Sequence, residues 1–439
     1  MKYVMTKTER DKAIIISLVR KFGQLSRIEI RNLTHWKSST ISILVRELQE
    51  EGKLLNYGLS DNLTGRRRVL LSINPKCGFV VGVALDDRIV QAAVMDLSAG
   101  IIDTTQETTC IDKGVDGLVE QLLGCTRRAI QQAGVKPDSI LGIGFADSSL
   151  IDSRQGISMY SSVIECWREV PVKKIFETEF GVPLLLENYT RAKTVAEAKM
   201  GPVDLVGDMI YIDCGGALSA GISAGIMVDG KILRGRRECA GEFGHIPIIE
   251  RGPACKCGSF GCLEAVDGGV ALASKVRKAI LEGSKSQVVA LVPGGDLDKI
   301  TGLTVLQAAK LGDKTCLAFV AELGEHLGLG LATLVNLFNP SLIVLDQCMG
   351  MAGKDLLEGI IRIVKMRALT RSTEDLVFQI GKLGIEGAAV GAGLVVLEDL
   401  FEVPMFRPPR YLIEQDEAAT APQAATAAGY PQDLRETAP

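Results

Sequence analysis

The chain of 439 residues lacks any long uncharged hydrophobic run, so we expect no membrane-spanning helix. Its first twelve residues contain no uninterrupted apolar stretch, so we also expect no signal peptide. The 11 cysteines are odd in number and, outside one short block, do not follow the spacing of a disulfide framework. These absences favour a protein of the reducing cytoplasm.

Charge is distributed unevenly along the chain. Residues 1–75 hold 14 Lys and Arg against 7 Asp and Glu, whereas the remaining residues hold 35 against 46. A basic head on an acidic body indicates that only the head meets a polyanion. The composition, 47% hydrophobic and 23% charged, is ordinary for a globular protein, and the length is sufficient for two or three domains.

The basic head has the pattern of three short helices followed by a hairpin. Thr8 with Asp11 is a candidate capping box for the first helix, and Ser26 is a candidate cap for the second, in which Ile28 is expected to face inward. The expected helices and strands cover 8–22, 27–33, 38–51, 54–57 and 69–73. This order predicts a winged helix-turn-helix, whose third helix enters the major groove of DNA.

Polar side chains off the apolar stripe of the third helix, and arginines in the turn of the hairpin, are the candidate DNA contacts. They are Lys37, Ser38, Ser39, Thr40, Ser42, Arg46, Arg66, Arg67 and Arg68. The arginines of the turn are expected to meet phosphate or the minor groove. The alternative is a small helical dimerisation module with solvated charges. The helix spacing, the hairpin and the positive charge together favour DNA binding.

Strands and helices then recur in two successive series, at about 79–190 and 205–400. This recurrence predicts an α/β body of two duplicated lobes with a cleft between them. The end of the chain is rich in Ala, Thr, Pro and Gln and is expected to be disordered. The expected winged helix, first lobe, second lobe and tail span 1–75, 76–195, 196–405 and 406–439.

One block in the second series carries metal-ligand chemistry. Its four candidate ligands have the spacing H-x9-C-x-C-x4-C and are His245, Cys255, Cys257 and Cys262. One imidazole and three thiolates suit a tetrahedral structural zinc ion. The alternative, ordinary reduced cysteines, does not account for three Cys within eight residues beside a His. The flanking Glu242 and Glu264 are not needed to complete such a site and are free for another polar ligand.

Several motifs make the chain resemble the ROK family of repressors, open reading frames and sugar kinases. They are A-G-E-F-G-H (240–245), C-K-C-G-S-F-G-C-L-E (255–264), S-S-T-I-S-I-L-V-R-E-L (38–48), T-G-R-R-R (64–68), E-N-Y-T-R-A (187–192), N-P-S-L-I-V-L (339–345) and G-A-A-V-G-A-G (387–393). The resemblance implies a duplicated actin/hexokinase-like (ribonuclease H-like) fold, preceded by a winged helix in the branch of N-acetylglucosamine and xylose repressors. It also implies zinc on the four ligands above and sugar hydroxyls on Asn188, Glu242, His245 and Glu264.

Three departures from the kinases of that family bear on catalysis. The kinases have Asp as the general base in E-N-D, where this chain has Tyr189, and a phenol is a poor base at neutral pH. Their phosphate-binding D-I-G-G-T is A-L-D-D-R here, and Asp86 and Asp87 in place of two glycines would repel phosphate. A Gly-rich motif after the N-P strand is replaced by L-D-Q-C (345–348). We therefore expect that phosphoryl transfer has been lost.

The combined expectation is a non-enzymatic DNA-binding regulator, most simply a repressor, of carbohydrate metabolism that works as a homodimer or homotetramer. A sugar or sugar-phosphate effector in the cleft is expected to change the lobe angle. Two alternatives stay open: an active sugar kinase with a DNA-binding head, and a regulator whose input is a partner protein. Tyr189 also leaves open whether the cleft accepts a sugar, since its ring is bulkier than the Asp it replaces.

Overall fold

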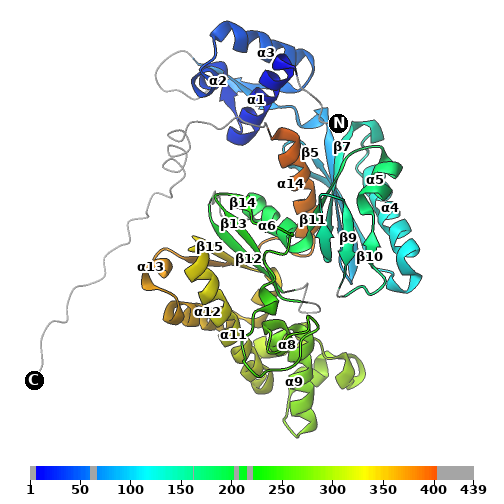
Figure 1. Cartoon of the computed structure of the whole chain (residues 1–439), viewed down its shortest axis with the longest axis vertical. Coiled ribbons are helices and arrows are strands. Elements are labelled where there is room, and N and C mark those ends of the chain that lie inside the picture. The colour runs from blue at the N-terminus through cyan, green and yellow to red at the C-terminus, as the bar shows by residue number, and fades with distance from the viewer. Residues whose placement is uncertain (1–5, 60–66, 162, 202–206, 215–220, 403–439) are drawn as a thin grey trace, which may run out of the picture. The chain divides into compact units, whose positions relative to one another are not determined.

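The computed structural model describes residues 6–59, 67–161, 163–201, 207–214 and 221–402. The described chain falls into two compact units, which divide between Ser72 and Ile73. Figure 1 shows the elements of both units along the chain. Arg66 and the segment expected to be a disordered tail lie outside the described residues.

The first unit is a three-helix head with a small sheet of order β1-β3-β2. Each helix buries apolar side chains on one face. Lys12 of the first helix pairs with Glu47 (2.8 Å) and Glu51 (2.6 Å) at the end of the third. Three helices and a hairpin are the expected parts of a winged helix-turn-helix. The elements are α1 (Lys7–Phe22), β1 (Leu25–Ser26), α2 (Arg27–Thr34), α3 (Ser38–Glu50), β2 (Leu54–Leu59) and β3 (Val69–Ile73).

Two local predictions for the head are wrong. The first helix is capped by Thr6 in a capping box with Glu9, not by Thr8, because the same S/T-x-x-E spacing occurs two residues earlier. Ile28 is 40% exposed and does not face inward. It lies roughly 200° around the helix from the buried Ile30 at 100° per residue. The Ser26 cap of α2 is confirmed.

The body begins with a five-stranded sheet of order β11-β7-β4-β5-β6. The central strand β4 pairs in parallel with β7 and antiparallel with β5, and β11 extends the parallel side. Helix α4 covers one face of this sheet. The elements are β4 (Phe79–Leu85), β5 (Ile89–Asp96), β6 (Ile101–Thr108), α4 (Gly114–Gln132), β7 (Ile140–Asp147) and β11 (Leu184–Asn188).

The second sheet repeats this plan in the order β14-β13-β12-β15-β16. Its central strand β12 also pairs antiparallel with the strand that follows it and parallel with a later one. The duplicated two-lobed body predicted from the sequence is therefore confirmed. The strands are β12 (Met209–Asp213), β13 (Ser223–Val228), β14 (Lys231–Ile232), β15 (Leu342–Leu345) and β16 (Val377–Ile380). The accompanying helices are α8 (Leu263–Asp267), α9 (Gly269–Leu281), α10 (Gly302–Lys310), α11 (Lys314–Phe338), α12 (Lys354–Arg367) and α13 (Thr370–Thr373).

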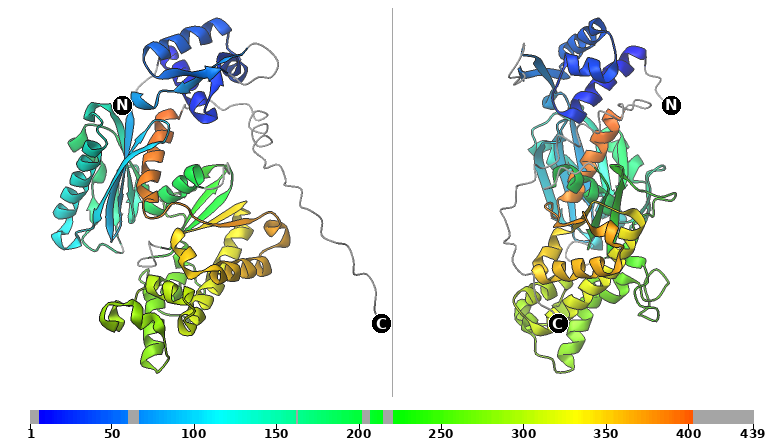
Figure 2. Two further views of the ribbon diagram at one scale, coloured as in Figure 1. Left: turned by 180° about the vertical axis from the view of Figure 1, so that it is seen from behind. Right: turned by 90° about the vertical axis from the view of Figure 1, so that its left-hand side faces the viewer.

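Two helices exchange lobes. Helix α6 (Tyr189–Met200) follows the first sheet but packs on β12 and β13, whereas α14 (Gly387–Phe401) follows the second sheet but packs on β4 and β7. The views in Figures 1 and 2 agree that α14 lies along the first sheet. A Cβ on Gly82 of β4 would lie 1.8 Å from Ala389 O of α14, so this close approach requires glycine. Since α6 and α14 also pack on each other, they join the lobes.

A small antiparallel sheet in the first lobe was not predicted. It contains β8 (Leu150–Asp152), β9 (Ile157–Tyr160) and β10 (Arg168–Val170), followed by α5 (Val172–Phe180). Strands of three or four residues are too short to show a clear alternation of polar and apolar residues. This sheet matters below because it ends beside a connection between the lobes.

Within the described residues, α11 is long and apolar enough by length and composition to cross a membrane. Glu322 and Glu325 interrupt its apolar sequence, so the segment does not stand out as an uncharged run. Half of its most apolar window is buried inside the protein. Its buried residues Leu323, Leu327 and Leu331 recur every fourth position and belong to the core of the second lobe, which is typical of a core helix.

Candidate functional site

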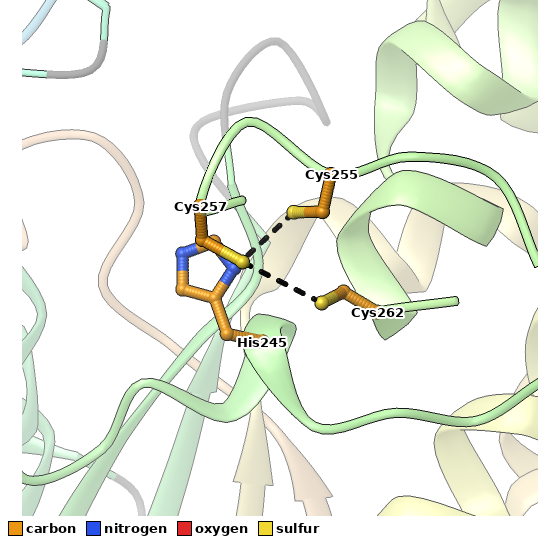
Figure 3. A group of neighbouring side chains, drawn as sticks. All are labelled: His245, Cys255, Cys257 and Cys262. Atoms are coloured by element: carbon orange, nitrogen blue, oxygen red, sulfur yellow. Dashed lines mark hydrogen bonds between the residues drawn. The ribbon is translucent and has the colours of Figure 1, made fainter. Parts of the chain in front are cut away.

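Four metal-ligating side chains converge in the second lobe. His245 ends a short helical turn, Cys255 and Cys257 lie in the loop that follows, and Cys262 immediately precedes α8. One donor atom from each lies within 4.8 Å of the others. The Cys255 Sγ is 3.5 Å from His245 Nδ1, and the Cys257 Sγ is 3.7 Å from Cys262 Sγ. Figure 3 shows the imidazole and the three thiols directed toward one another.

These separations fit a tetrahedral ion. With Zn–S bonds of about 2.3 Å, two sulfurs at the corners of a tetrahedron lie roughly 3.8 Å apart. The distance between Cys257 and Cys262 is close to this edge. The donor set, one imidazole and three thiols, is also that of structural zinc sites. The residues present can therefore hold a metal ion.

The loop that carries the thiols is closed by a few backbone contacts. An isolated antiparallel bridge joins Pro247 to Cys262, which brings the two ends of the loop together. Gly261 has a φ of +66°, and a Cβ there would lie 1.7 Å from Ile249 O. A glycine is required at this turn, because any side chain would collide with that carbonyl.

Two carboxylates lie beside the imidazole, as the sequence predicts for a polar ligand site. Glu242 Oε2 is 3.9 Å from His245 Nε2, the ring nitrogen that does not face Cys255. Glu264 of α8 accepts a hydrogen bond from Ile222 N at 3.3 Å. Partial burial raises the pKa of Glu242, and the charge of Glu264 adds to the effect while His245 opposes it. Glu242 therefore interacts with two of the other three predicted effector residues, His245 and Glu264.

The fourth predicted effector residue, Asn188, ends β11 and caps α6. Its Oδ1 accepts hydrogen bonds from Thr190 N (3.1 Å) and Arg191 N (3.2 Å). The start of the helix therefore orients the carboxamide, and its NH2 group remains a donor for a ligand. Arg191 connects this residue to the others electrostatically, since its charge acts on the pKa of Glu242.

A network at the start of α6 joins the two lobes. Arg191 donates to Glu187 Oε1 at 2.6 Å and to Glu238 O at 2.7 Å. Glu187 of the first lobe also accepts from Arg234 Nε of the second at 2.9 Å, and the Glu238 carboxylate accepts from Ser153 N at 3.2 Å. Glu187 and Arg191 are four residues apart, but sequence reasoning missed the network because the partners that connect the lobes are 47 or more residues apart in the chain.

A second buried network lies at the carboxyl ends of β12 and β15. Lys193 of α6 donates to Asp213 Oδ1 at 3.1 Å and to Asp346 Oδ2. Tyr211 OH donates to Asp346 Oδ2 at 2.7 Å, and Thr190 Oγ1 donates to Asp213 Oδ2 at 3.1 Å. In the sequence, Asp346 stands out only as a departure from a glycine-rich motif, and no pattern points to Lys193 or Asp213.

The charges in this network support one another. Burial alone would lower the pKa of Lys193, but Asp213, Tyr211 and Asp346 outweigh burial and raise it. Burial would raise the pKa of Asp346, but Lys193 outweighs burial and lowers it. Burial raises the pKa of Asp213 in spite of Lys193. The ammonium and the Asp346 carboxylate are therefore the stable ion pair.

A third charged cluster lies at the end of α8. Asp267 Oδ2 is 2.5 Å from His326 Nδ1, and Asp267 Oδ1 accepts from Lys275 Nζ at 2.7 Å. Lys275 also donates to Glu322 Oε1 at 3.0 Å. The hydrogen bond to Asp267 raises the pKa of His326. Asp267, Glu322 and His326 have metal-ligating atoms close together, but Lys275 already supplies a positive charge to both carboxylates.

The predicted DNA contacts lie on an exposed part of the head. Thr40 is half-buried, and the remaining described residues of the set, Lys37, Ser38, Ser39, Ser42, Arg46, Arg67 and Arg68, are exposed. Ile43 is 47% exposed on the same helix. Ile43 is apolar and is not among the predicted contacts, although an apolar side chain in the major groove can contact a thymine methyl.

Residues 80–399 match the model of the ROK family. The chain belongs to the ROK family. It is 27% identical to the xylose repressor of Caldicellulosiruptor bescii over 90% of this chain and 97% of that protein. A crystal structure of a ROK family transcriptional regulator, a homolog of the E. coli MLC protein, matches with a TM-score of 0.75 and 25% identity over 89% of this chain and 97% of that one. A ROK family glucokinase from Streptomyces griseus, in complex with glucose and AMPPNP, matches with a TM-score of 0.62 and 25% identity over 72% and 99%.

The departures from the ROK kinase motifs come together in space. Tyr189 OH donates to Asp86 Oδ2 at 3.3 Å, so the residue in place of the general base contacts the residue in place of a phosphate-loop glycine. Lys193 Nζ lies 5.8 Å from the centre of the Tyr189 ring and binds Asp346, which belongs to the third departure. The positions that appear as separate losses in the sequence form one network in this ROK body, with Lys193 in the middle.

Proposed function

We propose that this ROK protein is a DNA-binding transcriptional regulator of carbohydrate metabolism that represses its target genes. The head contacts operator DNA, and the body responds to a sugar or sugar-derived effector. One observation carries the proposal: a helix-turn-helix head precedes a ROK body in which Tyr189, bound to Asp86, stands where the kinases have their base. The name and length of the matching xylose repressor support it.

The amino end of α3 is the proposed reading element. Its first backbone N–H groups and the exposed Ser38 and Ser39 are donors for phosphate and base edges, and Lys37 and Arg46 add positive charge. The exposed Ser42 donates to Ser38 O at 2.8 Å, so its hydroxyl oxygen is available as an acceptor. Helix-turn-helix proteins bind palindromic sites as dimers. We therefore propose a homodimer or homotetramer on a palindromic operator.

The proposed effector contacts are Asn188, Glu242, His245 and Glu264. Carboxylates accept hydrogen bonds from sugar hydroxyls, and the Asn188 amide donates to them. The neighbouring Arg191 links Glu187 and Glu238 across the lobes. An effector that binds one lobe arrangement better than the other would shift their equilibrium and so change DNA affinity.

The proposed metal is one structural Zn2+ per chain, held by His245, Cys255, Cys257 and Cys262. Such an ion would join the loop to α8 and fix the ring of His245, so that Nε2 stays directed toward Glu242. All 11 cysteines are free thiols, which supports a cytoplasmic protein.

Sequencing the genomic DNA fragments that the immobilised protein retains tests the proposal. We expect enrichment of a palindrome near carbohydrate-metabolism genes and release of these fragments by one sugar of a panel. Arg46→Ala on α3 should reduce retention, whereas Lys278→Ala on an exposed helix of the body should not. Equal retention by the wild type and the Arg46 variant at all sequences would contradict α3 as the reading helix.

The salt dependence of operator affinity provides a quantitative test. Affinity should fall steeply with salt, because Lys and Arg side chains displace counterions from phosphates. If Arg46 contacts a phosphate, its removal should lower the slope of log K against log salt by about 1. A flat response of the wild type would argue against the basic head as the DNA contact.

The similarity to a glucokinase keeps a sugar kinase as the second candidate. A coupled ATP-consumption assay across hexoses and amino sugars separates the two. Turnover by the wild type that disappears in Asn188→Ala would favour the kinase. If no sugar stabilises the protein in thermal-shift measurements while operator binding persists, the input is a partner protein.

A further inference from the structure

Lys193 takes no part in the proposed DNA or effector binding, yet it is one of the most deeply buried charges of the body. Its side chain is 3% exposed, and the side chains of Asp213 and Asp346 are 4% and 5% exposed. A buried ion is costly unless its partners satisfy it. Two buried carboxylates pair with the ammonium, so the surrounding residues stabilise a cation at this position.

The two carboxylates occupy a position where ligands bind in α/β sheets. Strands β12 and β15 are parallel neighbours, Asp213 ends the first, and Asp346 follows the second. Such sheets bind their ligands at the carboxyl ends of the strands. The hydroxyls of Thr190 and Tyr211 complete the surroundings, since each bonds one of the carboxylates.

The atoms that bind Lys193 Nζ are carboxylate oxygens, which are also the ligands that a hard divalent cation prefers. Lys193 Nζ contacts one carboxylate oxygen of Asp213 and one of Asp346. The second oxygen of Asp213 accepts from Thr190 Oγ1, and the second oxygen of Asp346 accepts from Cys348 N. Mg2+, Mn2+ and Ca2+ prefer oxygen ligands of this kind. An ammonium makes up to three hydrogen bonds and carries one charge, so it satisfies the same oxygens with half the charge of a divalent ion.

We propose that Asp213 and Asp346 form a divalent-cation site in which the ammonium of Lys193 permanently takes the place of the ion. The tethered cation keeps the strand ends neutralised without metal and closes them to a metal-bound phosphate. This inference goes beyond the regulator proposal and is independent of it, because it concerns neither the operator nor the effector residues.

The position of Lys193 on the chain supports this role. It lies one turn after Tyr189 on α6, the helix that leaves the first sheet and packs on the second. Its ammonium bonds with Asp213 and Asp346 therefore tie α6 to the ends of two strands of the second sheet. The same bonds that exclude a free ion hold the helix that joins the lobes.

A manganese titration followed by thermal unfolding tests the proposal. Lys193→Ala removes the ammonium and leaves space between the carboxylates. We expect this variant to unfold several degrees below the wild type and to regain at least half of the difference in millimolar Mn2+, while the wild type does not respond. The zinc-ligand cluster is present in both proteins, so it cancels in the comparison. Lys193→Ala with Asp213→Asn is the control and should lose the recovery.

Two results would overturn the proposal: no recovery of Lys193→Ala in Mn2+, or equal stabilisation of Lys193→Ala and the wild type. Where Lys193→Ala does not fold, equilibrium dialysis of the wild type against Mg–ATP decides. If Lys193 closes the site, we expect no binding of Mg–ATP at 1 mM nucleotide. A submillimolar dissociation constant for Mg–ATP would contradict the proposal. Operator retention by the wild type is measured separately, so failure here leaves the regulator proposal intact.

Discussion

The Cys/His cluster can surround a metal ion, whereas the Lys193 network surrounds an ammonium group that belongs to the chain itself. The Cys/His donors come from a single loop between residues 245 and 262, and a positive charge among them would have to be supplied by a metal ion. Lys193 brings its own charge to carboxylates 20 and 153 residues away. The ligands of the first cluster are therefore close together in sequence, but its charge depends on the supply of metal ions. The members of the second cluster are far apart in sequence, but its charge needs no metal.

Breaking the loop cluster should have the largest effect. Cys262 is buried and immediately precedes α8, so Cys262→Ser should remove the proposed zinc and release both the loop and the helix. We expect loss of about 4 kcal/mol or more of unfolding free energy, as is typical when a structural metal is lost. Metal analysis should fall from about one zinc per chain to none.

The matched control for this prediction is Cys239→Ser. Cys239 is exposed and lies outside the cluster, so the variant should keep its metal and unfold within about 0.5 kcal/mol of the wild type. Full metal content in the Cys262 variant would show that the other three side chains are sufficient, or that the metal lies elsewhere.

Disrupting the Lys193 network should lower the unfolding free energy slightly less than loss of the zinc site. Lys193→Met keeps an unbranched side chain of similar size but leaves Asp213 and Asp346 as neighbouring buried carboxylates without the ammonium. We expect a loss of about 3–5 kcal/mol at pH 7.5, the usual result of leaving a buried charge unpaired. Chelators should not reproduce this loss in the wild type, whereas they should reproduce that of Cys262→Ser.

The pH dependence of the unfolding free energy tests whether charge causes the effect of Lys193→Met. In the wild type Lys193 lowers the pKa of Asp346, so its stabilising contribution is present above the unfolded pKa of about 3.9 and is lost below it. In Lys193→Met the two carboxylates repel each other and are expected to take up a proton more readily. The difference in unfolding free energy between the two proteins should therefore shrink from pH 7.5 to pH 5. A constant difference would show that lost packing, not charge, causes the destabilisation.

The contrast also explains what the sequence can reveal. The Cys/His ligands and the duplicated sheets were predictable, because local spacing and periodicity are properties of short segments. Lys193 was not, since a lysine within a helical segment is normally solvated and its partners follow strands far along the chain. Tyr189, Asp86 and Asp346 were noticed only as departures from a motif. Tyr189 contacts Asp86 directly, and Lys193 connects Asp346 to the Tyr189 ring. These contacts depend on how the two lobes fold together, and no local pattern in the sequence predicts them.

The cluster at the end of α8 shares a feature with each of these sites: it contains possible metal ligands, and a lysine of the chain supplies a positive charge to them. His326 faces Asp267, with Lys275 and Glu322 around them, and Asp267 belongs to the helix that Cys262 begins. The hydrogen bond to Asp267 raises the pKa of His326, so its stabilising charge is present below the unfolded pKa of about 6.5 and is lost as pH rises through the folded pKa. His326→Gln should cost about 1–2 kcal/mol at pH 6 and less at pH 9, measured by urea unfolding. An equal cost at both values would contradict a charged His326.

The smallest effect is expected at the edge of the Lys193 network. Tyr189→Phe removes the 3.3 Å hydrogen bond to Asp86 but leaves that carboxylate with backbone donors, Arg88 N at 2.8 Å and Ile89 N at 2.7 Å. Because Asp86 stays satisfied, we expect a loss of only about 1 kcal/mol. The coupling energy between Tyr189→Phe and Asp86→Asn should be of similar size in a double-mutant cycle, at about 0.5–1 kcal/mol. A loss above about 3 kcal/mol would show that the network depends more on Tyr189 than on Lys193. The position of the Lys193 ammonium would then depend on the Tyr189 contact.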